Sequence, residues 1–157
     1  MKFIAVFQNK LKNSYITFSQ ENPKSEVIVN GNIKNLKKGK HGFHIHEKGN
    51  LTKTDCSKCE GHWNPTNKQH GGRNDTNSHA GDFGNITSND KNESKFHFTT
   101  KKITLFGKYS IIGRSVIIHE DEDDLGLGHF EDSKTTGHSG KRIACSVIGI
   151  SKNGICK

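Results

Sequence analysis

Residues 41–49 read HGFHIHEKG and hold three of the ten histidines of the chain. Two of these, His44 and His46, lie two positions apart with Ile45 between them. In a helix, residues at this spacing lie on different faces, whereas in a strand they share one face, with Cβ atoms roughly 6–7 Å apart. Two imidazoles on one strand face can converge on a single point, or they can simply face solvent on a half-buried strand. The rest of the sequence has to distinguish these two possibilities.

Short apolar runs bounded by turn residues recur along the 157-residue chain. They are rich in β-branched and aromatic residues, and no helical periodicity extends beyond about two turns. This pattern predicts an all-β protein, an antiparallel sandwich or barrel, and the length predicts one domain over residues 1–157. The predicted strands are FIAVF (3–7), YITFS (15–19), EVIVNGNIKNL (26–36), GFHIHE (42–47), FGNIT (83–87), KFHFTT (95–100), ITLFG (103–107), RSVIIHE (114–120) and RIACSVIGI (142–150).

Two long segments do not fit the strand pattern. Residues 48–82 are polar and rich in Gly, Asn, His, Cys and Lys, and residues 120–140 begin with the acidic run EDEDDLGLG. Long loops inside a compact domain are usually functional or disordered. Because these two loops hold most of the remaining histidines, we predict that they carry the function.

The chain is basic, with a formal net charge of +8 and lysines spread along its length. It has neither a long basic run nor aromatic residues interleaved with basic ones, so we expect no nucleic-acid partner. A general positive field instead favours anionic substrates. The apolar run Phe3–Phe7 is shorter than the roughly 7–15 residues of a signal-peptide core, and nothing approaches the about 20 residues of a membrane span. We therefore expect a cytoplasmic protein without a membrane partner.

The chain has four cysteines, and two of them form the motif CSKC (56–59). A CxxC motif is typical of half a zinc knuckle or of a redox pair. No second CxxC completes a four-cysteine zinc site, and no βαβ pattern indicates a thioredoxin fold. The motif alone therefore decides little.

Seven side chains are candidate metal ligands, most of them in or beside the first long loop. Loop residues need something to fix them, and a metal supplies it because its binding free energy becomes folding free energy. Three imidazoles and one carboxylate suit zinc, whereas an all-imidazole set suits copper. One histidine that binds through both ring nitrogens can serve two metals, although spacing does not show such sharing. The candidates are His44, His46, His62, His70, His79, Asp82 and His119.

Several motifs together resemble the copper/zinc superoxide dismutases. They are GFHIHEKG (42–49), GHWNP (61–65), HGG (70–72), HAGDFGNI (79–86), IIGRSVIIHEDEDDLGLG (111–128) and GHSGKRIACSVIGI (137–150). Their order and spacing match the family from about residue 3 to residue 150. The resemblance implies an eight-stranded antiparallel Greek-key barrel or sandwich with two long functional loops, usually as a homodimer.

The resemblance also implies a role for each candidate. Asp123 matches an aspartate that hydrogen-bonds one ligand histidine of each metal, which fixes ring orientation and tautomer. Arg142 matches the arginine that attracts and orients the anionic substrate, and Cys56 and Cys145 match a disulfide pair. The implied copper ligands are His44, His46, His62 and His119, and the implied zinc ligands are His62, His70, His79 and Asp82, with His62 as the bridge.

The reaction implied by the resemblance is the dismutation of superoxide to oxygen and hydrogen peroxide, with copper cycling between two oxidation states. His62 is then expected to leave copper and carry a proton in the reduced state. Zinc does no redox chemistry and is expected to hold the loop and tune the bridging imidazole. Because encounter limits such fast chemistry, we expect Arg142, Lys141 and Lys134 to form a positive funnel.

The other histidines are expected to bind no metal. His41 matches a structural histidine of the family, and His97 is expected to be exposed on a strand. His129 and His138 are expected to be solvated in the second loop.

The sequence departs from the family pattern in its loops. The segment between His46 and Cys56 is one residue longer than is common, which bears on the expected dimer contact. Gly61 stands where proline is common, and Thr135 stands where lysine is common.

Two cysteines, Cys59 and Cys156, have no counterpart in the family pattern. Cys59 is a rival of Cys56 for pairing with Cys145, but the spacing of Cys56 from His62 fits the family.

Two other functions are compatible with such a barrel, because a fold does not fix a function. A metal-binding decoy or partner-binding relative should lack a copper ligand or the guiding arginine, and this sequence keeps them all. A copper-delivery protein should expose thiolates, and the CxxC motif is the only feature that supports it.

Overall fold

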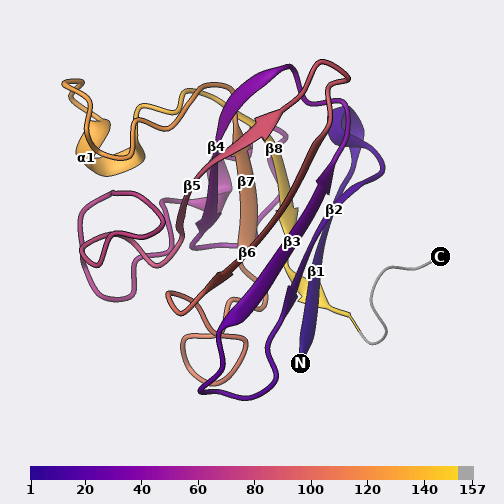
Figure 1. The fold of residues 1–157 in the computed structure, drawn as a ribbon, viewed down its shortest axis with the longest axis vertical. Coiled ribbons are helices and arrows are strands. Elements are labelled where there is room, and N and C mark those ends of the chain that lie inside the picture. Colours follow the sequence, from indigo (N-terminus) through magenta and orange to yellow (C-terminus); the bar gives the residue numbers. More distant parts are fainter. Residues whose placement is uncertain (152–157) are drawn as a thin grey trace.

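The structure is a computed structural model that describes residues 1–151, and it consists mainly of two antiparallel sheets (Figure 1). One sheet has the strand order β6-β3-β2-β1-β9 and the other has the order β5-β4-β7-β8. The predicted all-β Greek-key sandwich is confirmed. The strands are β1 (Lys2–Phe7), β2 (Ser14–Ser19), β3 (Val27–Ile33), β4 (Gly39–His46), β5 (Asp82–Ser88), β6 (Ser94–Thr100), β7 (Ser115–His119), β8 (Arg142–Val147) and β9 (Gly149–Ile150).

The core lies between the two sheets and is built by the alternation of side chains along each strand. In β3, Val27, Val29 and Ile33 are buried, while Ile28 and Asn30 between them are exposed. This is the period of two that places alternate residues on one face of a strand.

The central strands β4 and β7 are different because both of their faces are covered. Along β4, Phe43 and Ile45 join the hydrophobic core, and Ile45 is 0 % exposed. His44 and His46 point to the opposite face and are also buried. The long loops cover that outer face, so an apolar core and a polar histidine site lie on the two sides of the same strand.

Both long loops leave the same side of the sandwich, the left side in Figure 1. The first loop runs from the end of β4 to the start of β5 and contains the short 3-10 helix η2 (Ser57–Cys59). The second runs from β7 to β8 and contains the one-turn helix α1 (Ser133–Thr136). The third short helix, η1 (Asn9–Leu11), lies between β1 and β2. The two loops correspond to the segments 48–82 and 120–140 that were predicted from the sequence.

Two strand predictions need correction. Residues 103–107 form no strand, because the backbone N–H of Leu105 donates to Gln20 Oε1 at 2.7 Å instead of to a neighbouring strand, while the Leu105 side chain is buried. The run 142–150 divides at Ile148 into β8 and β9, which belong to different sheets. The two-residue β9 pairs with β1 and adds a ninth strand to the eight expected. Cys156 lies outside the described residues.

Candidate metal centre

Four histidines from three parts of the chain meet on the outer face of β4. His44 and His46 project from β4 itself, and the neighbouring strand β7 ends at His119. The first loop returns alongside β4. There the backbones of His46 and His62 form an isolated antiparallel β-bridge, and the Trp63 N–H donates to Ile45 O at 2.8 Å. Each of the four imidazoles offers a nitrogen, and these nitrogens all lie within 4.8 Å of one another.

Backbone carbonyls fix the tautomers of two of these rings. Nδ1 of His46 donates to Glu60 O at 2.7 Å, and Nδ1 of His119 donates to Gly140 O at 3.1 Å. A carbonyl oxygen only accepts, so each Nδ1 must carry the hydrogen and each Nε2 is left with a lone pair. Both Nε2 atoms are buried without a hydrogen-bond partner.

A carboxylate fixes the third ring in the same way. Nε2 of His44 donates to Asp123 Oδ2 at 2.6 Å, which leaves His44 Nδ1 buried and without a partner. His62 Nε2 is likewise buried and has no partner. Unpaired buried polar atoms are rare in folded proteins. Four of them within 4.8 Å of one another form a donor set that suits a bound copper ion.

Burial keeps these four rings in the form that binds metal. Desolvation is the largest cause that lowers the pKa values of His44, His46, His62 and His119, and it brings that of His119 to about 3. The imidazoles are therefore neutral near pH 7, with their lone pairs available.

A second cluster shares His62 with the first and is centred on Asp82. Asp82 Oδ1 lies 2.8 Å from His62 Nδ1 and 3.1 Å from Nδ1 of both His70 and His79. Ligand atoms around a tetrahedral zinc ion are separated by roughly 3.3 Å, as metal–ligand bonds of about 2.0–2.1 Å require. The three imidazoles and the carboxylate therefore already have nearly the spacing of a zinc site.

The second carboxylate oxygen of Asp82 orients the cluster. It accepts the backbone N–H groups of Gly71 at 3.0 Å and His79 at 2.9 Å. Burial raises the pKa of Asp82, but hydrogen bonds from the facing imidazoles outweigh burial and hold this pKa well below its usual range. The carboxyl group is thus ionised, as a zinc ligand must be.

Asp123 joins the two clusters from behind. Its Oδ2 accepts from His44 Nε2 at 2.6 Å, and its Oδ1 accepts from His70 Nε2 at 2.8 Å. Asp123 is itself held by Asn85, whose Oδ1 accepts the Asp123 N–H at 2.7 Å. The buried carboxylate of Asp123 therefore orients one histidine of each cluster.

Comparison with known proteins identifies the family of the chain. The family model described as Copper/zinc superoxide dismutase (SODC) matches residues 12–148. The chain belongs to the copper/zinc superoxide dismutase family. The cofactors of this family, copper and zinc, suit the two donor sets described above.

Individual relatives agree with this assignment. Superoxide dismutase [Cu-Zn] 5 of Dictyostelium discoideum is 48% identical over 152 residues, which cover 97% of this chain and 99% of the relative. An extracellular superoxide dismutase [Cu-Zn] of Drosophila melanogaster is 50% identical over 135 residues, which cover 86% of this chain and 74% of that one. The crystal structure of the clock protein EA4 superposes with a TM-score of 0.90 at 41% identity, covering 96% of this chain and 94% of that one.

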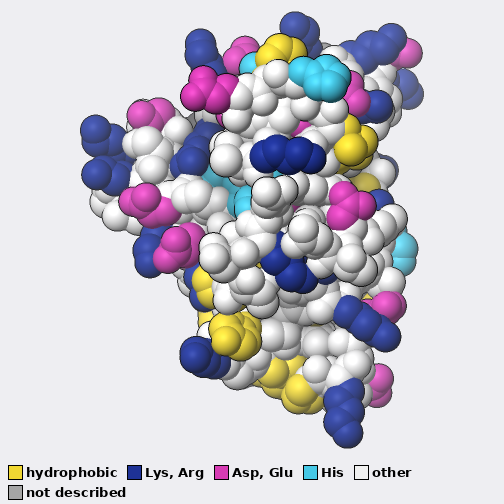
Figure 2. Space-filling model, turned by 90° about the vertical axis from the view of Figure 1, so that its left-hand side faces the viewer, with side chains coloured by type: hydrophobic (Ala, Val, Ile, Leu, Met, Phe, Trp, Pro, Cys, Tyr) yellow, Lys and Arg dark blue, Asp and Glu magenta, His cyan; other side chains and the backbone are white. Residues whose placement is uncertain are grey.

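The two histidine clusters open into a cavity of about 720 Å³ at the loop-bearing face. Figure 2 shows this face, with a histidine surface visible in a recess between outer side chains, several of them Lys or Arg. Arg142 and Lys141 line the cavity together with His62 and Thr135. Lys134 is not among the lining residues. The cavity is therefore lined by two of the three cations that were expected to form the funnel.

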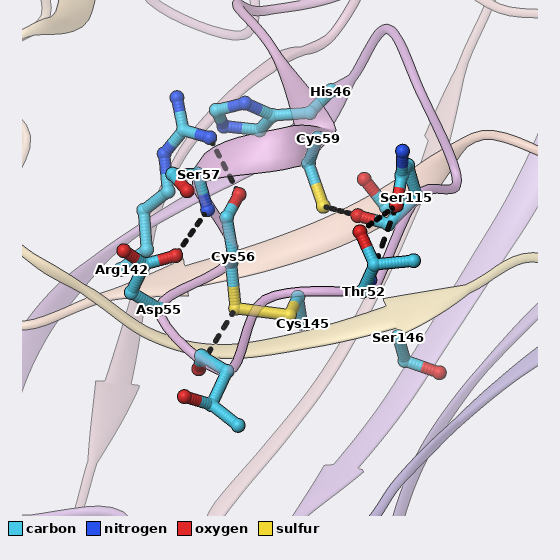
Figure 3. The surroundings of a disulfide bond; sticks show 12 residues. His46, Thr52, Asp55, Cys56, Ser57, Cys59, Ser115, Arg142, Cys145 and Ser146 are labelled. Atoms are coloured by element: carbon cyan, nitrogen blue, oxygen red, sulfur yellow. Dashed lines mark hydrogen bonds between the residues drawn. A yellow bond between two sulfur atoms is a disulfide. The ribbon is translucent and has the colours of Figure 1, made fainter.

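The first loop holds Arg142 in place. Arg142 Nη1 donates to Cys56 O at 2.8 Å, and Arg142 Nη2 donates to Glu60 O at 2.7 Å. A guanidinium has five N–H donors, so others remain for an anion in the cavity. Cys56 forms the predicted disulfide with Cys145, while Cys59 is a buried free thiol beside it (Figure 3).

The remaining histidines of residues 1–151 lie outside both clusters. Both ring nitrogens of His41 contact backbone carbonyls, those of His119 and Lys37, each at 2.8 Å. His97 is exposed on β6, and His129 and His138 are exposed in the second loop.

Glu60 is the functional residue that the sequence does not reveal. Its carbonyl oxygen accepts from both His46 and Arg142, and its backbone has φ 62° and ψ −155°. A backbone carbonyl acts whatever side chain the residue carries, so the residue type gives no signal of this role.

Proposed function

We propose that this chain is a superoxide dismutase in which His62 bridges two metal ions. The copper ligands are His44, His46, His62 and His119, and the zinc ligands are His62, His70, His79 and Asp82. The single observation that carries this assignment is the set of four buried imidazole nitrogens that face one space without a hydrogen-bond partner.

When bound, copper supplies the one-electron oxidation and reduction that convert superoxide to oxygen and hydrogen peroxide, and zinc, which has no redox chemistry, holds the first loop. The protein contributes orientation, through Asp123 on His44 and His70 and through backbone carbonyls on the other rings.

Arg142 and Lys141 attract and orient the substrate anion. Both line the cavity, and the two carbonyl contacts of Arg142 fix its guanidinium at one side of the opening. Positive charge that is focused in a cleft raises the encounter rate with an anion.

His62 is the residue placed to move a proton. Its Nδ1 lies 2.8 Å from Asp82 Oδ1, whereas its Nε2 has no hydrogen-bond partner and its ring lines the cavity. Nε2 can therefore hold a proton in one half of the cycle and donate it toward the cavity in the other.

Removal of single ligands tests the assignment of the two sites. His119→Ala should lose copper while keeping about one zinc per chain, and His79→Ala should lose zinc first, because each side chain belongs to one site only. Metal analysis of the purified variants measures both. Equal loss of both metals from both variants would refute separate sites, and an inactive wild-type protein with both metals bound would support the decoy function instead.

We also propose a homodimer. Exposed apolar side chains near β1, β8 and β9 support it, since such surface favours association. Sedimentation at several protein concentrations tests it, and a monomer at every concentration would refute it. The exposed residues are Val6, Leu51, Ile112, Val147 and Ile150.

Location and organisation complete the proposal. We expect the chain to act in the cytoplasm, without a nucleic-acid or membrane partner, as one domain over residues 1–157. None of the helices in residues 1–151 has the length and apolar character needed to cross a membrane. Cell fractionation tests the location, and recovery of the protein outside the cell, as the name of one relative describes, would contradict it. A single unfolding transition of the metal-loaded protein tests the one-domain prediction.

A further inference from the structure

A second cavity, of about 440 Å³, lies next to the proposed metal centre and has no part in the proposed reaction. Its volume is within the range of roughly 300–1,000 Å³ that is typical of small-molecule sites. We call it the lysine pocket. Its apolar lining residues are Trp63, Pro65, Ala80, Ile103 and Tyr109, and its charged lining residues are Lys68, Lys101, Lys102 and Asp75.

Two neighbouring backbone segments separate the lysine pocket from the copper/zinc centre. His62 and His79 line the mouth of the metal centre, whereas the next residues, Trp63 and Ala80, line the lysine pocket. This alternation follows from the extended backbone at Trp63, whose carbonyl also accepts the Gly81 N–H at 2.9 Å. The pocket is therefore a separate space with a common wall.

The aromatic wall of the lysine pocket is held rigidly. The guanidinium of Arg114 lies 3.1 Å from the ring centroid of Trp63, and Arg114 Nη1 is itself fixed by a hydrogen bond to Glu47 O at 2.9 Å. A ring that is fixed in this way gives a planar ligand a surface to pack on at little entropic cost.

The charges of the lysine pocket favour an anion. Three lysines and one aspartate give its lining a formal charge of +2. Asp75 is already engaged, since its Oδ2 accepts the Gly72 N–H at 2.7 Å.

The lysines differ in their availability. Lys68 Nζ donates to Thr76 O at 2.6 Å, and Lys102 Nζ donates to Ser78 Oγ and lies 3.4 Å from Asp82 O. Lys101 has no side-chain hydrogen bond or ion pair with any residue in 1–151.

We propose that the lysine pocket binds a small planar aromatic anion, such as an aromatic carboxylate, packed against Trp63 with its charge at Lys101 and Lys102. The apolar residues accept the ring, and the lysines select the charge. The site lies outside the channel that leads to the metals.

Trp63 makes the proposal directly testable, because it is the only tryptophan of the chain. Benzoate is titrated into the protein loaded with copper and zinc, and the Trp63 emission is followed. The indole N–H resonance of the reduced protein is recorded as a second signal. A saturable change in both signals is expected, with binding weakened about tenfold for neutral benzamide, as the loss of a charge-assisted contact predicts.

Matched variants locate the binding. Lys101→Gln should weaken benzoate binding severalfold, whereas Lys91→Gln removes the same charge at a distant exposed turn and should leave it unchanged. Arg142→Leu should also leave it unchanged, because Arg142 lines the other cavity. The absence of a saturable change, equal binding of benzamide, equal effects of the two lysine variants, or loss of binding in Arg142→Leu would each overturn the proposal.

Discussion

Glu60 holds two functional side chains through its carbonyl oxygen, which accepts from His46 Nδ1 and from Arg142 Nη2, both at 2.7 Å. Its φ of 62° with ψ of −155° belongs to a region that is open essentially to glycine and that costs other residues about 1–3 kcal/mol. The chain therefore keeps a strained residue at the point where His46, the proposed copper ligand, and Arg142, the proposed anion-binding residue, are both positioned.

Replacement of Glu60 by glycine should stabilise the protein. Relief of strain outweighs the entropy that glycine adds to the unfolded chain, and we expect a net gain of about 1 kcal/mol. The free energy of unfolding in urea measures it. Glu60→Ala is the matched control, because it removes the charge and keeps the Cβ that causes the strain. A Gly variant no more stable than the Ala variant would show that the backbone is not strained.

Arg142→Ile should lower kcat/KM for superoxide by about tenfold or more and weaken its dependence on ionic strength. The residue is a cation at the cavity wall, and salt screens its attraction for an anion. Stopped-flow measurements across a salt series give both quantities. Arg142→Lys keeps the charge and should keep the salt dependence. An unchanged rate and salt response in Arg142→Ile would remove this residue from the steering role.

The protonation of His70 should make zinc binding depend on pH. Burial lowers the pKa of His70, but its contacts with Asp123 and Asp82 outweigh burial and raise this pKa to about 9 in the metal-free protein. Below that pH the ring is protonated and must lose a proton before it binds zinc. Zinc binding at pH 7 should therefore release about one proton, and zinc affinity should rise with pH toward 9.

The copper site provides the internal comparison for this test. Its histidines have lowered pKa values, so they are already neutral at pH 7 and should release almost no proton when copper binds. Calorimetry in buffers of different ionisation enthalpy measures both numbers of protons. Zinc affinity that does not change between pH 6 and 9, or equal proton release for both metals, would contradict this account of His70.

At the scale of elements, the disulfide ties the first loop to β8. Cys56 lies directly before η2 and Cys145 lies within β8, and the two are separated by 89 residues in sequence. Because the Cys56 carbonyl also accepts from Arg142, the covalent link and the placement of the arginine depend on the same short segment (Figure 3).

Removal of the disulfide should destabilise the fold substantially. A closed loop of this length contributes about 4–5 kcal/mol on the chain-entropy model. The double variant Cys56→Ser, Cys145→Ser should lose about this much in chemical unfolding, whereas Cys59→Ser, at a neighbouring buried thiol, should lose far less. Equal losses in the two proteins, or a Cys59–Cys145 linkage in unreduced peptides, would contradict the pairing.

Several elements were predictable from sequence for a physical reason. Alternation in β3 and the His-x-His spacing of β4 report directly on strand faces, so both were located correctly. Residues 103–107 have the same apolar alternation but lie in a loop, because Gln20 takes the hydrogen bond that a neighbouring strand would accept. Such a side-chain contact between distant residues leaves no periodic signal.

At the scale of the whole molecule, the sequence alone indicated which residue types could bind metal. It did not indicate that these residues come together in space. His44 and His119 are 75 positions apart, and their ring centroids lie 4.9 Å apart only because β4 and β7 are neighbours in the sheet. The resemblance to the family supplied that adjacency. The lysines of the lysine pocket lie outside the recognised motifs, and Glu60 acts through its backbone carbonyl, so the structure was needed to find both features.

The second-order rate constant for superoxide loss, measured with protein that carries one copper and one zinc per chain, tests the central claim most directly. A bound copper ion in this donor set, reached through a positively charged cavity, predicts a rate constant near the diffusional ceiling of about 10⁸–10⁹ M⁻¹s⁻¹ that falls as ionic strength rises. With both metals bound, superoxide loss no faster than in protein-free buffer would contradict the account.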